Sequence, residues 1–168
     1  MNKAIIILTG SSTGRAKFNE IAKRTCWLWS INPKNYLTNT AKNLYWNGDR
    51  DNNFYGFISG LLESSNSAFN FEENYIAEKL EKFHQDADDY KRNENNITFS
   101  KFLLVIEGVS NKLIKKLEDE EGAFQLHIAQ SQNTNIEKHD YTVFETSNTF
   151  CEDVERVINV LTNEKEKV

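Results

Sequence analysis

Short runs of apolar and β-branched residues recur along the chain and predict its strands. The first run covers 4–9 and is apolar almost throughout, and similar runs cover 25–31, 99–106, 124–128 and 141–144. A strand that is apolar on both faces is typical of a parallel sheet with helices on its two sides. The pattern therefore predicts a parallel sheet of about five strands.

Between these runs, apolar residues recur at helical spacing. They predict helices after the first strand, around 54–62, over 71–83, after the capping residue Ser110 and after Thr149. Strands that alternate with helices indicate an α/β fold, here a three-layer sandwich with helices on both faces of the sheet. The chain has a single proline and no Gly/Ser-rich linker, so residues 1–168 are predicted to form one domain.

Local signals predict where several elements begin and end. Asn32-Pro33 breaks the second strand, because proline cannot donate to a sheet. Gly122 ends the helix before it, as glycine does in a left-handed conformation. Thr149–Glu152 has the pattern of a capping box. The polar stretch 84–96 is predicted to be an exposed loop or a lid-like segment.

The charge of the chain argues against nucleic acid as a partner. The 168 residues carry a formal net charge of −5, and they contain no basic run. Nucleic-acid binders usually present a basic face, since phosphate contacts dominate their affinity. An acidic protein can instead imitate DNA or engage a basic protein partner, and the sequence leaves a homodimer open.

The cysteines and histidines indicate neither a metal site nor an oxidising compartment. Cys26 and Cys151 lack metal-ligand spacing. The histidines are scattered along the chain, at His84, His127 and His139. The apolar run 4–8 is too short to span a membrane or to form the core of a signal peptide. We therefore expect a cytoplasmic protein with reduced thiols, no bound metal and no membrane contact.

A cluster of small residues follows the first strand. It consists of Gly10, Ser11, Ser12, Thr13 and Gly14. Small residues at this position let backbone N–H groups turn toward a phosphate, and the next helix aims its N-terminus at the anion. The cluster is thus a candidate nucleotide- and phosphate-binding loop. A tight strand-to-helix turn explains it equally well.

The residues after this cluster depart from the usual phosphate-loop motif, G-x-x-x-x-G-K-[ST]. The run from Gly10 to Arg15 is one residue short, with Arg15 in place of the lysine and Ala16 in place of the Mg²⁺-binding hydroxyl. Arginine can hold phosphate, but its planar fork does not replace a compact ammonium well. Lys17 is close enough in sequence to reach in, so Arg15 and Lys17 are the candidate catalytic cations.

Several segments together suggest a family. The start, 4–10, looks like a kinase strand and loop, and the run WNGDRD at 46–51 looks like the pattern W-[DN]-G-x-[KR]-[DT]. The helix around 57–62, the segment 103–124 and the segment 140–149 follow in the matching order. This order resembles the deoxynucleoside monophosphate kinase-like proteins of phages and prophages, which belong to the P-loop kinases. The resemblance implies a P-loop kinase-like fold, a nucleotide ligand and, for an active enzyme, ATP and Mg²⁺.

The same resemblance suggests a site for the acceptor nucleotide, a cellular location and a biological role. Trp46, Asp49 and Arg50 are candidates to contact the acceptor nucleotide. The alternative for Asp49 and Arg50 is a solvated cluster at the start of a helix. A phage origin would place the protein in the host cytoplasm, in nucleotide metabolism or in countering host defence.

Further departures from the family lie where phosphate should be held. Glu107 stands in the place of an arginine of an I-R-x-P run, and Gln130 stands in the place of another basic residue. Phosphoryl transfer depends on positioning and on cations that stabilise the spreading negative charge. The substitutions therefore predict a degenerate kinase homologue that binds a nucleotide or a partner with little or no phosphotransfer. An active kinase with an unusual phosphate loop and a pure protein-interaction module on a kinase fold remain as alternatives.

Overall fold

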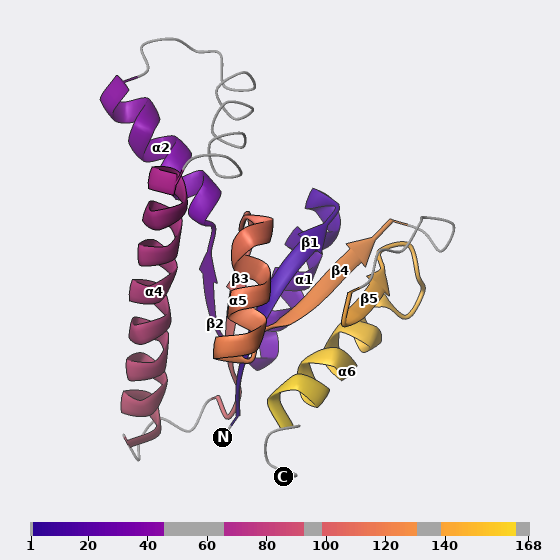
Figure 1. Cartoon of the computed structure of the whole chain (residues 1–168). Helices are drawn as coiled ribbons and strands as arrows, with labels where there is room; N and C mark the ends of the chain where they lie inside the picture. Colours follow the sequence, from indigo (N-terminus) through magenta and orange to yellow (C-terminus); the bar gives the residue numbers. More distant parts are fainter. Residues whose placement is uncertain (1, 46–65, 93–98, 131–138, 164–168) are drawn as a thin grey trace.

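The computed structural model describes residues 2–45, 66–92, 99–130 and 139–163. Within these ranges five parallel strands form one sheet in the order β2-β3-β1-β4-β5. The strands are β1 (Lys3–Gly10), β2 (Trp27–Ile31), β3 (Phe102–Ile106), β4 (Phe124–Ala129) and β5 (Tyr141–Phe144). The predicted α/β class and the five-stranded parallel sheet are confirmed (Figure 1).

Strand β1 lies in the centre of the sheet, which explains its continuous apolar run. It pairs with β3 on one side and with β4 on the other, so that Ile6 lies opposite both Val105 and Phe124. Ala4 to Leu8 are all buried. Side chains alternate between the two faces along the strand: Ile6 belongs to one core cluster and Ile5 to the other.

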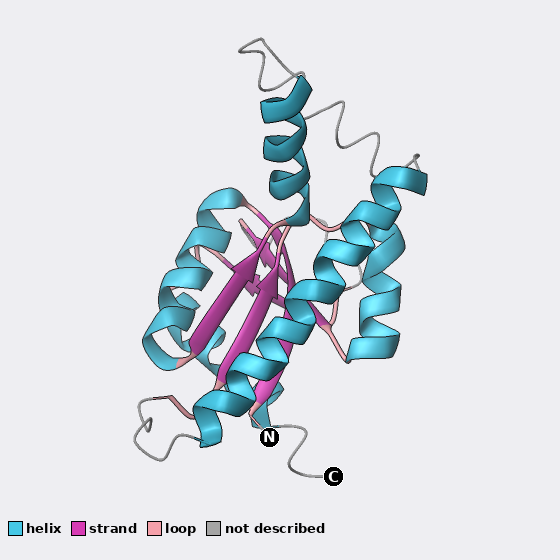
Figure 2. Ribbon diagram, turned by 90° about the vertical axis from the view of Figure 1, so that its left-hand side faces the viewer, coloured by secondary structure: helices cyan, strands magenta, loops and turns pink. Residues whose placement is uncertain are grey.

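One face of the sheet is covered by α1 (Ser12–Thr25) and α6 (Phe150–Asn163). The two helices contact each other, and Phe18 of α1 and Val154 of α6 are fully buried in the cluster that they form with the sheet. The opposite face is covered by α4 (Asn66–Arg92) and α5 (Asn111–Glu121), so the sheet is the middle layer of three (Figure 2).

Helix α4 corrects the prediction for the polar stretch that begins at His84. The structure continues the helix from Asn66 to Arg92, instead of ending it at Phe83. Ala87 is fully buried, and Tyr90 packs edge-on against Trp27. Residues 83, 87 and 90 thus extend the buried stripe by i+4 and i+3 steps, while Gln85 and Asp89 are exposed.

Helix α2 (Pro33–Tyr45) was absent from the sequence prediction. Pro33 does end the second strand, but it also occupies the first helical position, where its missing N–H and fixed φ cost nothing. The Asn32 side chain accepts a hydrogen bond from the Asn35 N–H at 3.0 Å, as a helix cap does. The helix predicted around 54–62 lies outside the described residues.

The predicted helix ends are largely confirmed. Gly122 closes α5 in the left-handed conformation, with φ at 68°. Helix α6 begins directly after Thr149, as predicted. The predicted capping box is wrong, because the Thr149 N–H donates to Ser147 Oγ and not to the Glu152 side chain. Among the described helices, none is long and apolar enough to cross a membrane.

Candidate functional site

The candidate phosphate loop is a tight turn at the carboxyl edge of the sheet. Strand β1 ends at Gly10 and α1 begins at Ser12, so Ser11 alone separates them. Gly10 has φ at 113°, and a Cβ there would overlap the Ile128 carbonyl of β4. The Ser11 N–H donates to that carbonyl at 3.1 Å. Gly10 is therefore required by the close approach of two strands.

Gly14 also has a packing role in this turn. A Cβ at Gly14 would overlap the Ile128 side chain, so glycine lets the first turn of α1 lie close to β4. The Gly14 N–H donates to Ser11 Oγ at 3.0 Å, which makes Ser11 the N-cap of α1. The remaining donors for an anion are the N–H groups of the first turn, at Ser12 and Thr13, which have no partner within the helix.

A carboxylate already lies at this helix N-terminus. Glu145 follows β5 and accepts hydrogen bonds from Ser11 Oγ at 2.5 Å and from Thr13 Oγ1 at 2.8 Å. Lys17 Nζ lies 3.5 Å from the same carboxylate. The hydrogen bonds from Ser11 and Thr13, with help from Lys17, lower the pKa of Glu145. The Glu145 side chain is only 13% exposed, so the ionised carboxylate is held in place as a built-in anion.

A second carboxylate holds the arginine that replaces the expected lysine. Arg15 Nη1 lies 2.6 Å from Glu107 Oε1, and Arg15 Nε donates to the Gly10 carbonyl at 3.2 Å. Glu107 follows β3, and its N–H donates to the Ile31 carbonyl at 3.0 Å. The pair thus bridges the carboxyl ends of β1 and β3, and the guanidinium is committed to protein groups.

A third carboxylate, Glu72 of α4, lies in the interior beside the turn after β3. It is 1% exposed, and it accepts from Ser110 Oγ at 2.5 Å and from the Ser110 N–H at 3.1 Å. The serine predicted to cap α5 with its own side chain instead gives both donors to Glu72. Glu72 thereby fastens α4 to the N-terminus of α5.

A histidine pair lies on the β4 side of the site. His127 Nδ1 lies 2.9 Å from Thr9 Oγ1, and the His127 ring stacks on the His139 ring with centroids 4.5 Å apart and planes at 6°. Parallel stacked rings do not converge on a common point. Among the described residues, no group of three or more His, Cys, Asp or Glu side chains is arranged to hold a metal ion.

The structure brings together much of the predicted site. Residues 10–14, Arg15 and Lys17 meet around one helix N-terminus, and Glu107 faces Arg15. Gln130 is exposed, and its carbonyl accepts from Thr146. Trp46, Asp49 and Arg50 lie outside the described residues. Trp27 and Trp29 stack on each other over the core.

Sequence reasoning missed Glu145 and Glu72. A signal existed for Glu145, because it directly follows a predicted strand, and the carboxyl ends of parallel strands share one edge of the sheet. Glu72 lies inside a helix among other acidic residues, and no local pattern separates it from them.

Comparison with known proteins gives little beyond this geometry. No protein-family model matches the sequence, and no curated protein matches it. Among solved structures, the chain is similar to a cysteine-to-alanine mutant of the Mycobacterium tuberculosis APS kinase CysC. The identity is 12% and the TM-score 0.49, over 96% of this chain and 99% of that one. A likeness of this degree specifies neither a ligand nor an activity.

Proposed function

We propose that this protein is a degenerate relative of the nucleoside monophosphate kinases that acts by binding a partner and transfers little or no phosphate. One observation carries the proposal: the side chains that would bind phosphate are already bonded to carboxylates of the chain itself. Glu145 takes the hydroxyls of Ser11 and Thr13, and Glu107 takes the guanidinium of Arg15.

The electrostatics of the turn support a loss of phosphotransfer. A nucleotide phosphate at the N-terminus of α1 would meet the ionised Glu145, and like charges at close range repel. Its attraction to Arg15 would have to compete with the 2.6 Å pair to Glu107. The Ala16 side chain has no hydroxyl for Mg²⁺. Because the loss of one cationic group typically lowers phosphoryl-transfer rates by about 10³-fold, the combined losses leave little catalysis.

The first experiment measures binding and transfer on the same protein. The purified chain is screened by thermal shift with ATP, dATP and the deoxynucleoside monophosphates, each with and without Mg²⁺, and then assayed for phosphate transfer from ATP. A ligand at about 100 times its Kd would add about 2.7 kcal/mol of stability. We expect no shift with any of these nucleotides and no transfer.

A matched pair of variants shows whether the carboxylate is the cause. Glu145→Gln removes the charge at the turn, and we expect a thermal shift with ATP to appear in this variant alone. Glu20→Gln removes a charge from the same helix at a side chain that is 68% exposed, and it should behave like the wild type. Phosphate transfer by the wild-type chain, abolished in Arg15→Ala, would overturn the proposal in favour of an active kinase.

A further inference from the structure

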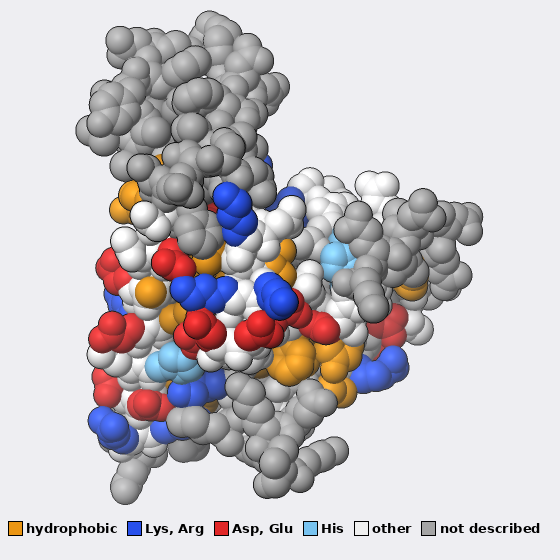
Figure 3. Space-filling view, in the orientation of Figure 1, with side chains coloured by type: hydrophobic (Ala, Val, Ile, Leu, Met, Phe, Trp, Pro, Cys, Tyr) orange, Lys and Arg blue, Asp and Glu red, His pale blue; other side chains and the backbone are white. Residues whose placement is uncertain are grey.

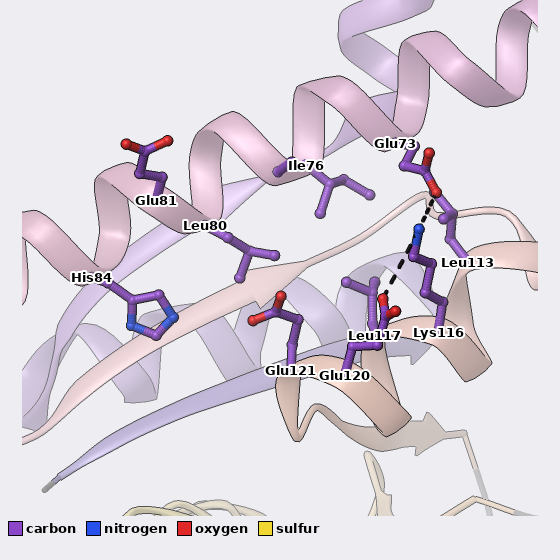
Figure 4. Close-up of a pocket in the computed structure, with 11 residues that line it drawn as sticks. Glu73, Ile76, Leu80, Glu81, His84, Leu113, Lys116, Leu117, Glu120 and Glu121 are labelled. Carbon is purple, nitrogen blue, oxygen red and sulfur yellow. Dashed lines mark hydrogen bonds and ion pairs between the residues drawn. The ribbon is translucent and has the colours of Figure 1, made fainter.

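A groove between α4 and α5 lies on the face of the sheet opposite α1 and α6. Its volume is about 370 Å³. Ile76 and Leu80 of α4 point across it toward Leu113 and Leu117 of α5 (Figure 4). These four side chains are 2–6% exposed, so they form a narrow apolar floor between the helices. Such a shape admits a short row of large side chains and not a flat surface.

Carboxylates dominate the rim of this groove. They are Glu73, Glu81, Glu120 and Glu121. Lys116 lies 2.5 Å from Glu73 and 3.9 Å from Glu120, and thus offsets one of the two negative charges at that end. Among the described residues, Glu81 and Glu121 take part in no ion pair. Acidic side chains lie beside small apolar patches over this face of the molecule, with basic side chains among them (Figure 3).

We propose that this groove is a docking site for a basic amphipathic helix of a protein partner. Apolar residues of that helix, spaced at i, i+4 and i+7, would enter between Leu80 and Leu117. Lysine or arginine residues beside them would meet Glu81 and Glu121. The part of α4 that lines the groove, 73–84, is about 17 Å long at 1.5 Å per residue, which matches three turns of a partner helix.

The charge of the rim selects this occupant over a second copy of the chain. In a two-fold symmetric dimer both copies use the same patch, so the acidic rim with Glu81 and Glu121 would face the acidic rim of the other copy. Such like-charge contacts are unfavourable, whereas a basic helix turns the same carboxylates into attractive partners. This inference rests on the proposed function, in which the chain acts by binding a partner, and it identifies the surface that would bind that partner.

The test uses the full chain and a synthetic probe. The probe is a fluorescein-labelled helical peptide with leucines at i, i+4 and i+7 and lysines on both flanks, and a control peptide carries glutamates in place of the lysines. Fluorescence anisotropy should show micromolar binding of the lysine peptide and at least about tenfold weaker binding of the glutamate peptide. Equal binding of the two peptides, or no binding of either, would overturn the proposal.

Variants at exposed positions locate the binding surface without disturbing the core. Ala77 is exposed at the mouth of the groove, so Ala77→Trp should fill it and weaken binding by about tenfold or more. Glu81→Lys/Glu121→Lys should weaken binding to a similar degree. Glu78→Lys/Asp119→Lys makes the same change in charge at exposed positions of the same two helices, outside the groove, and should cost less than about threefold.

Two results would contradict the proposed surface. Equal losses in the two double variants would mean that the peptide responds to net charge alone. A wild-type dimer in sedimentation that Ala77→Trp converts to a monomer would assign the groove to a second copy. The nucleotide screen and the phosphotransfer assay do not depend on this groove, so failure here and failure of the proposed function are told apart.

Discussion

Two helix N-termini lie at the same edge of the sheet, and each is preceded by a serine that donates a hydrogen bond to a glutamate far away in sequence. The two serines nevertheless bond differently. Ser11 before α1 and Ser110 before α5 have nearly the same backbone, with φ/ψ of −65°/144° and −71°/153°. Ser11 caps its own helix and also donates to Glu145. Ser110 makes no side-chain cap and gives both of its donors to Glu72.

Burial decides what each carboxylate does. Glu72 is 1% exposed and holds two helices together, so we assign it a structural role. Glu145 keeps 13% of its side chain exposed, and its bonds go to Ser11 and Thr13 at the N-terminus of a single helix, α1. The same chemical arrangement therefore joins two helices in one place and supplies a built-in anion to a helix N-terminus in the other.

The largest expected effect comes from Glu72→Ala. Ser110 would keep a buried N–H and hydroxyl without their charged acceptor, and hydrogen bonds to charged groups are worth about 1.5–3 kcal/mol each. We expect a loss of about 3 kcal/mol in the free energy of unfolding, measured by urea denaturation. Glu73→Ala is the matched control, because Glu73 is the next residue and pairs at the surface with Lys116. Equal losses of unfolding free energy in both variants would mean that the buried Glu72–Ser110 bonds stabilise the fold no more than the Glu73–Lys116 surface pair does.

This comparison also shows what the sequence could predict. The central strands were predictable because helices bury them on both faces, which leaves continuous apolar runs such as Phe102–Ile106. The second half of α4 was not predictable, because only Phe83, Ala87 and Tyr90 mark its buried face and the residues between them are polar.

The candidate site was predictable only in part, for a different reason. Its cations and glycines lie within eight residues of one another, from Gly10 to Lys17. The carboxylates that neutralise them come from far away in sequence: Glu145 is 134 residues from Ser11, and Glu107 is 92 residues from Arg15. Pairings of this kind are set by strand order, which local patterns do not encode.

An intermediate effect is expected at the Arg15–Glu107 pair, which lies between the two capped termini. Both side chains are less than one third exposed, at 28% and 16%. A double-mutant cycle of Arg15→Ala and Glu107→Ala should give a coupling of about 1 kcal/mol in the free energy of unfolding. The cycle with Glu20→Ala and Lys23→Ala, an exposed pair on the same helix, should give less. Equal coupling in the two cycles would mean that Arg15 is not held firmly and remains available to a ligand.

The smallest effect tests whether Glu145 acts through its charge, as the built-in anion of the comparison. Because its pKa is lowered in the folded state, chiefly by the hydrogen bond from Ser11, ionised Glu145 favours folding at pH values above its ordinary pKa of 4.5. That contribution is lost as the pH falls through the lower pKa of the folded state. The difference in urea midpoint between the wild type and Glu145→Gln should therefore be largest at neutral pH and should shrink steadily below about pH 4.5. Glu155→Gln, at an exposed position of α6, is the control for the loss of one surface carboxylate. A difference that stays constant down to pH 3 would mean that the carboxylate acts through packing and not through its charge, and Glu145 would then join Glu72 as a structural fastening.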